Sequence, residues 1–107
     1  MIENILNASG IPYRESRYPN PPSKTYAVYF DDLDVSGPDP FPGVPKIVTH
    51  NLTVELYEPQ QDPAAEAAIE AQLNAVGLAW TKQARYWLQN AQRYQVIYEF
   101  SYKVKGG

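Results

Sequence analysis

Acidic side chains crowd one short stretch of the sequence and are the first candidates for chemistry. Residues 32–37 read Asp-Leu-Asp-Val-Ser-Gly, which matches the opening of a twelve-residue calcium-binding loop. The second half of that loop is missing, because position twelve is Gly43 where the motif needs a bidentate glutamate, and prolines replace the exiting helix. The sequence therefore predicts a solvated acidic loop and no metal site.

The only histidine of the chain, His50, is the first candidate for catalysis. A single histidine excludes zinc sites that need two and leaves a catalytic triad without a spare base. Strand alternation puts His50 on the same face as Val48 and Leu52, which favours a hydrogen-bonded histidine at the margin of the core. The alternative is a small enzyme that uses His50 with Glu55. We favour the first interpretation, and predict no catalytic residues and no cofactor.

Aromatic and basic residues alternate near the end of the chain. Tyr86 and Trp87 follow Arg85, and Tyr94 follows Arg93. Such interleaving can bind single-stranded nucleic acid by stacking, with Tyr86, Trp87 and Tyr94 as the platform. The rest of the chain is acidic, however, and Tyr, Trp and Arg are also enriched in protein interfaces. We therefore favour core packing plus a protein interface, with no specific nucleic acid as partner.

Length and composition indicate one domain, residues 1–107, with 44% hydrophobic residues and no cysteine. No apolar run approaches the roughly 20 residues of a membrane span, so we expect no membrane partner. The net charge of −3 hides an asymmetry. Residues 1–80 hold eleven Asp or Glu and four Lys or Arg, a net −7, and residues 81–107 hold one Glu and five Lys or Arg, a net +4.

This charge split suggests how copies of the chain could contact one another. Acidic residues recur every four positions along one predicted helix, and basic residues gather in the C-terminal region. Our hypothesis is that the first group of one copy lies near the second group of the next copy. The acidic group is Asp62, Glu66 and Glu70, and the basic group is Lys82, Arg85, Lys103 and Lys105.

One long strand organises the predicted fold. From Tyr94 to Val104 every second residue is aromatic or branched aliphatic, so six large side chains line one face of this strand. Burying all six would contribute on the order of 10 kcal/mol. We therefore expect the rest of the chain to cover this face. The predicted core face holds Val28, Val54, Tyr98 and Phe100.

The remaining segments complete an α+β fold in the order αββαββ. We predict a mainly antiparallel sheet of about four strands, with the helices packed on one of its faces. Asp62 is the expected N-cap of the second helix, and Pro63 its first residue. The predicted helices are residues 1–8 and 63–76, and the predicted strand segments are residues 25–30, 47–57, 78–82, 86–88 and 93–105.

The connection between the first two predicted strands, residues 31–45, is too long and too rich in proline for a simple turn. Together the two strands predict a long β-hairpin whose loop this is. Loops of this length often carry function. We therefore expect the loop to be a contact element of the protein.

Three stretches of the chain resemble small tail-terminator or head-to-tail joining proteins of long-tailed bacteriophages and of prophages of Gram-positive bacteria. They are residues 24–32 (KTYAVYFDD), 49–59 (THNLTVELYEP) and 81–100 (TKQARYWLQNAQRYQVIYEF). The resemblance implies a minor structural protein of the virion. Members of this family are α+β domains that form a ring, usually hexameric, which caps the tail tube and joins it to the neck. The family has no catalytic residues to carry over.

The resemblance also implies partners and a location. The partners are other copies of this chain, the tail tube protein and the neck or head-completion protein. The location is the tail-neck junction of a virion assembled in the cytoplasm of a bacterial host. Combining the resemblance with the long loop and the charge split, we predict an assembly interface of Asp31, Asp32, Asp34, Asp39, Phe41, Glu66, Glu70, Lys82, Arg85 and Lys103.

Overall fold

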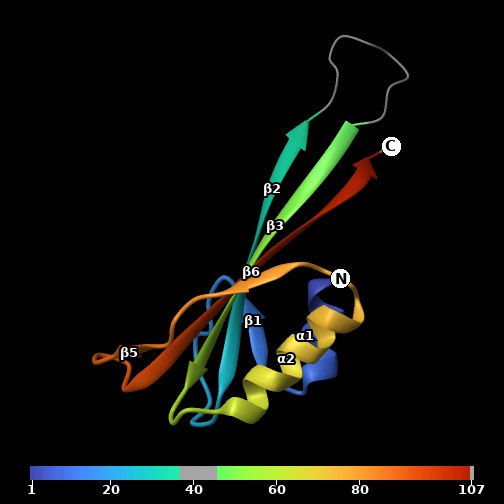
Figure 1. The fold of residues 1–107 in the computed structure, drawn as a ribbon. Coiled ribbons are helices and arrows are strands. Elements are labelled where there is room, and N and C mark those ends of the chain that lie inside the picture. Colours follow the sequence, from blue (N-terminus) through green and yellow to red (C-terminus); the bar gives the residue numbers. More distant parts are fainter. Residues whose placement is uncertain (37–45, 107) are drawn as a thin grey trace.

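A computed structural model describes residues 1–36 and 46–106, which form two helices and one six-stranded sheet (Figure 1). The fold is α+β, as predicted. Neither of the described helices is long and apolar enough to cross a membrane. The elements are α1 (Ile2–Ser9), β1 (Tyr13–Glu15), β2 (Tyr26–Ser36), β3 (Lys46–Glu58), α2 (Pro63–Ala75), β4 (Trp80–Lys82), β5 (Tyr86–Leu88) and β6 (Arg93–Gly106).

The sheet has the strand order β1-β2-β3-β6-β4, and β5 also pairs with β6. β1 runs parallel to β2, and the other pairs are antiparallel. The predicted count of about four strands is therefore wrong, and the sheet is mixed. The predicted order missed β1, because its three residues stand among prolines and are too few to show alternation.

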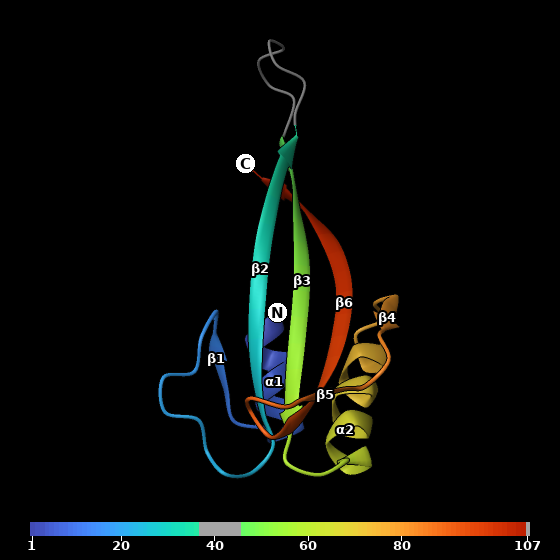
Figure 2. The ribbon, with the colours of Figure 1, turned by 90° about the vertical axis from the view of Figure 1, so that its left-hand side faces the viewer.

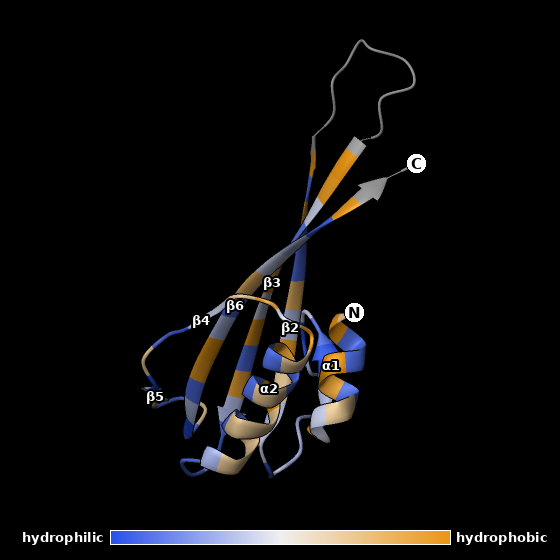
Figure 3. Ribbon diagram, turned by 45° about the vertical axis from the view of Figure 1, so that its right-hand side comes forward, coloured by the Kyte–Doolittle hydropathy of each residue, from blue (hydrophilic) through white to orange (hydrophobic). Residues whose placement is uncertain are grey.

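Both helices form where the sequence predicts them and pack on the same face of the sheet (Figure 3). In α2 the side chain of Asp62 accepts a hydrogen bond from the backbone N–H of Ala65 at 3.1 Å, which caps the helix. Ile69 and Leu73 are fully buried below it. Val76, the last residue of the predicted helix, follows the last turn instead and is 46% exposed.

The core lies between the helices and the sheet. Val54, Tyr98 and Phe100 are buried and Glu99 is exposed, which confirms the predicted register of the last strand. The prediction for Val28 is wrong. Val28 pairs with Glu55 and so faces away from the helices, although it is buried there. Residues 25–30 are apolar or aromatic almost throughout, so alternation alone could not select the face.

The opposite face carries its own aromatic cluster. The rings of Tyr26 and Tyr57 stack with centroids 5.1 Å apart, and Tyr18 packs edge-on against Tyr26. The Arg93 guanidinium lies 5.3 Å from the centre of the Tyr26 ring and donates a hydrogen bond to the carbonyl of Pro22 at 2.9 Å. These contacts hold the proline-rich connector of residues 16–25 against the sheet.

Three strands run far beyond the helices and form an arm (Figures 1 and 2). We define the arm as residues 31–36 of β2, 46–51 of β3 and 101–106 of β6. The strands project because they are longer than the helices that cover them. At about 1.5 Å per residue the 13 residues of α2 span about 20 Å, whereas the 14 residues of β6 span about 46 Å at 3.3 Å per residue. The helices can therefore cover less than half of the strand.

The arm corrects two predictions. We expected the whole apolar face of the last strand to be covered, but Tyr102 is only half-buried and Val104 is 45% exposed. We also expected a loop from residue 31, but β2 continues through Asp31, Asp32 and Asp34 to Ser36. The β-hairpin is therefore longer than predicted.

Candidate functional site

The acidic residues predicted to lie in a loop stand on β2, in the arm. Asp32 and Asp34 are two residues apart and share the face directed away from the helix layer, and both are exposed. The Asp34 carboxylate accepts a hydrogen bond from the side chain of Asn51 at 2.8 Å. Extended backbone does not wrap these carboxylates around an ion, and in residues 1–36 and 46–106 no group of three potential metal ligands comes together. Asp39 and Phe41 lie outside the described residues.

His50 lies where the arm leaves the core. Its Nδ1 is 2.9 Å from a carboxylate oxygen of Asp31, and its ring stacks on Tyr102 with centroids 4.6 Å apart. The prediction of a hydrogen-bonded histidine at the margin of the core is confirmed. Glu55 is on the opposite face of β3 and accepts a hydrogen bond from the Tyr57 hydroxyl at 2.8 Å. The structure therefore does not bring together the pair required by the alternative of a small enzyme.

The aromatic residues considered for nucleic-acid stacking do not form one platform. Trp87 pairs with Tyr94 across β5 and β6, and their rings meet edge-on, with centroids 4.9 Å apart and planes at 64°. Tyr86 pairs with Gln95 and so belongs to the other face of the sheet. Stacking of successive bases needs several ring faces on the same side. This geometry disfavours the alternative of a single-strand binder.

Four residues of the predicted interface meet one another inside one chain. Lys82 on β4 forms ion pairs of 2.8 Å with both Glu66 and Glu70 of α2. Arg85 binds Glu66 at 2.5 Å and reaches Glu58 at 3.4 Å. The acidic helix and the basic segment after it are therefore partners within the fold. Ion pairing between copies through these four residues stays a prediction, and part of the charge split is already explained without it.

Glu58 is the member of this cluster that the sequence did not single out. Its side chain is fully buried on the core face of β3, and one carboxyl oxygen accepts no hydrogen bond from the described residues. Burial, together with the adjacent Glu66, raises the pKa of Glu58 to about 7. Burial also opposes ionisation of Glu66, but hydrogen bonds from Glu58, Arg85 and Lys82 lower its pKa to about 2. Between pH 2 and pH 7 the pair therefore consists of one protonated and one ionised carboxyl group.

The alternation of residues along β3 contains a signal that Glu58 is buried. Glu58 continues the series of even-numbered core residues 52, 54 and 56, so the alternating pattern places its side chain on the core face. Glu66 likewise stands three residues before Ile69 and seven before Leu73, which puts it on the buried side of α2. Two buried acidic side chains need a cationic partner because an unpaired buried charge is costly, and Arg85 is that partner.

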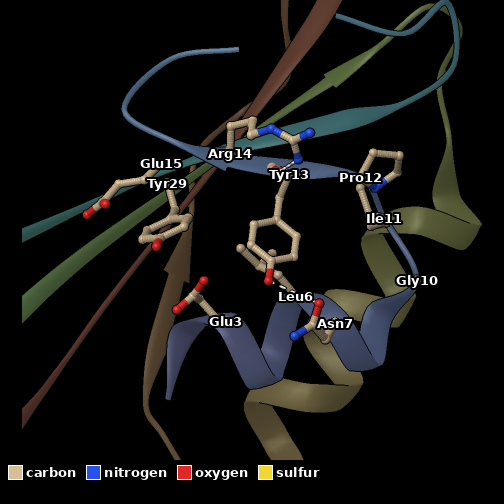
Figure 4. A pocket seen from close by; sticks show the side chains of 10 residues that line it. All are labelled: Glu3, Leu6, Asn7, Gly10, Ile11, Pro12, Tyr13, Arg14, Glu15 and Tyr29. Carbon is tan, nitrogen blue, oxygen red and sulfur yellow. Dashed lines mark hydrogen bonds between the residues drawn. The ribbon is translucent and has the colours of Figure 1, made fainter.

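A hollow of about 640 Å³ lies between α1 and β1 (Figure 4). Three of its polar side chains form hydrogen bonds within the lining. The Tyr13 hydroxyl donates a hydrogen bond to Asn7 at 3.0 Å, and the Arg14 guanidinium donates to the carbonyl of Tyr13 at 2.7 Å. Glu3 and Glu15 line its rim, and the Tyr29 side chain lies between them. This arrangement offers a surface hollow and no catalytic constellation.

The arm exposes a row of apolar side chains. On the face that continues the core, Leu33 and Val35 are 56% and 60% exposed, and Val104 lies in line with them. Figure 3 shows that the apolar segments of the strands continue past the helices. Exposed apolar residues grouped in this way, rather than scattered singly, mark interaction surfaces.

Comparison with known proteins identifies a similar fold in a solved structure. No protein-family model matches the sequence, and no curated protein does. Among solved structures, a chain of the "Virion of native gene transfer agent (GTA) particle" is similar, with a TM-score of 0.62 and 17% sequence identity. The likeness covers 95% of this chain and 84% of that chain. At this identity the match shows a shared fold.

Proposed function

We propose that this protein is a virion structural protein that assembles as a ring at the junction of tail and neck. It acts there as a tail terminator or head-to-tail joining protein. The ring is hexameric, as is usual in the family that the sequence resembles. Its partners are the tail tube protein on one side and the neck or head-completion protein on the other, and its role is mechanical rather than catalytic.

The observation that carries this proposal is the fold shared with a chain of a gene transfer agent virion. The sequence resemblance to tail-terminator proteins is independent of that likeness and points to the same class. The arm adds a physical reason, because a projecting sheet with exposed apolar residues requires a partner. The acidic groups buried beneath the helices, Glu58 and Glu66, are held in structural ion pairs with Arg85 and Lys82, which is consistent with a role in assembly.

Deletion of the gene from its phage or prophage tests the proposal. Loss of a joining protein should yield separate heads and tails by electron microscopy and a loss of infectious particles. A plasmid copy should restore joined particles. A plasmid carrying Glu3→Lys, an exposed position on α1, should restore them equally and serves as the matched control.

Location is tested separately with antibodies against the protein bound to gold particles. The label should lie between the head and the tail of purified virions. Joined, infectious particles formed without the gene, or virions that lack the protein, would show that the proposed function is wrong.

A further inference from the structure

Both outer strands of the arm have an open edge. β1 pairs with β2 only as far as Tyr29, and β4 pairs with β6 only as far as Phe100. Within the described parts of the chain, β3 is the sole strand that pairs with residues 31–36 of β2 or with residues 101–106 of β6. We call these segments the β2 edge and the β6 edge. Open edges of this length are templates for pairing with another strand.

The two edges match in length and height. Through β3, Asp32 is level with Ser101 and Ser36 is level with Lys105. Because β2 and β6 are both antiparallel to β3, they are parallel to each other. A second copy, rotated about an axis along the arm, would therefore bring its β2 edge beside the β6 edge in parallel orientation.

The two edges carry opposite charge. On the face directed away from the helix layer, the β2 edge presents Asp32 and Asp34, and the β6 edge presents Lys103 at the level of Asp34. Pairing two β2 edges would set acids against acids, and like charges directly opposite are destabilising. Pairing a β2 edge with a β6 edge sets acids beside a base. Charge thus favours head-to-tail contact, the kind of contact that builds a ring when the rotation from copy to copy closes.

The other face of the two edges is also complementary. Leu33 and Val35 on the β2 edge are level with Tyr102 and Val104 on the β6 edge. In a parallel pair these side chains would lie next to one another and remove apolar surface from water. One contact would therefore satisfy open backbone groups, opposite charges and exposed apolar residues together.

We propose that copies of this chain join through their arms, with the β2 edge of one copy paired in parallel to the β6 edge of the next, so that the sheet continues around the ring. This proposal rests on the proposed function for the ring itself, and it names the surface that builds it. It also predicts that the helix layers lie outside the contact.

Charge reversal tests the contact by light scattering and sedimentation of the purified full chain. Asp34→Lys and Lys103→Asp should each weaken assembly about tenfold, as expected for about 1.4 kcal/mol of lost attraction and added repulsion. The double variant exchanges the charges at positions 34 and 103, which restores opposite charges at the same level, and should assemble like the wild type. An equimolar mixture of the two single variants should form rings in which they alternate. Glu3→Lys and Arg17→Asp are controls with equal charge changes at exposed positions outside the arm.

Disulfide trapping tests the pairing without relying on charge. The chain has no cysteine, so Ser101→Cys can be combined in turn with Phe30→Cys, Asp32→Cys or Asp34→Cys. These positions share a face, and the three combinations allow a stagger of two residues either way. Within one copy β3 separates the two strands, so positions 32 and 101 are about 9.5 Å apart, beyond disulfide reach. One combination should give a ladder of cross-linked multimers, and Glu3→Cys with Ser101→Cys should not.

The outcomes separate this proposal from the proposed function. The wild type could assemble while charge reversal has no effect, the double variant shows no rescue and no cysteine combination gives cross-links. That result would overturn the edge contact and leave the ring function standing. If the wild type is monomeric in solution, the cysteine variants are expressed in virions and oxidised there. Virions that contain the protein but no cross-linked multimers overturn the contact. Absence of the protein from virions, together with a monomer in solution, overturns both proposals.

Discussion

The two halves of the long strands differ in what covers them. Under the helices, Val54, Val96 and Tyr98 are completely buried. In the arm, side chains of the same kind at the same alternate positions are exposed, Val35 to 60% and Val104 to 45%. The alternating pattern thus specifies which face of a strand is apolar. It does not specify whether the covering layer comes from the same chain or from another.

The charged residues show the same division. Beneath the helices, Glu66 binds Lys82 and Arg85 within one chain and is nearly inaccessible. On the arm, Asp32, Asp34 and Lys103 are exposed, and β3 keeps the acids apart from the base. Charges under the helices contribute to the stability of the fold. Charges on the arm are available to select a partner, and exposed pairs contribute orientation and encounter rate more than affinity.

The largest expected contrast between the halves is in truncation of leucines. Leu73→Ala removes a completely buried side chain of α2 and should lower the free energy of unfolding by about 2–5 kcal/mol. Leu33→Ala removes a side chain that is 56% exposed on the arm and should change it by less than about 0.5 kcal/mol. Urea unfolding of both variants as monomers measures the difference. Equal losses would mean that the arm is part of the cooperative core.

Sequence reasoning identified the covered half well, because its signals were local. Asp62 and Pro63 marked the start of α2, and the alternation around Tyr98 set the register. The arm could not be predicted in the same way. A prediction of strand is ambiguous where Asp31, Asp32 and Asp34 follow Phe30, since acids are depleted in strands and favour turns. In the structure this segment is extended because β3 pairs with it, and this pairing is a contact between residues that are distant in the sequence.

A smaller effect is expected from the buried acid, and it depends on pH. The pKa of Glu58 is raised to about 7 from an ordinary 4.5, so folding favours the protonated form. Its contribution to stability is full below pH 4.5 and is lost as the pH rises through 7. Glu58→Gln stays neutral. Relative to that variant, the wild type should lose on the order of 1–3 kcal/mol between pH 4.5 and pH 8.

Urea unfolding of the monomer across this pH range measures the difference between the two proteins. Glu15→Gln is the control, because it changes an exposed acid on β1 and leaves the buried cluster intact. The lowered pKa of Glu66 acts in a different range, since that stability is lost only as the pH falls toward 2. If the free energies of unfolding of the wild type and of Glu58→Gln change with pH in parallel, the protonation of Glu58 in the folded protein is contradicted.

The candidate site was only partly predictable for the same reason. Each acidic residue of the proposed contact was named from the sequence, as was Lys103. What the sequence could not give is their division into two edges. Asp34 and Lys103 are 69 positions apart, and only the pairing of both strands with β3 brings them to one level. The alternation along one strand does not show which residue of a neighbouring strand lies opposite which of its own residues.

The smallest predicted effect concerns the junction between the halves. His50 holds the three strands together at the base of the arm through its hydrogen bond to Asp31 of β2 and its stacking on Tyr102 of β6, so His50→Ala should cost about 1 kcal/mol of unfolding free energy. Asn51→Ala, one residue along, removes an exposed hydrogen bond to Asp34 and should cost less than about 0.5 kcal/mol. If the junction orients the arm, His50→Ala should also weaken assembly in light scattering, whereas Asn51→Ala should not. A stability loss without any change in assembly would mean that pairing between copies orients the arm without help from this junction.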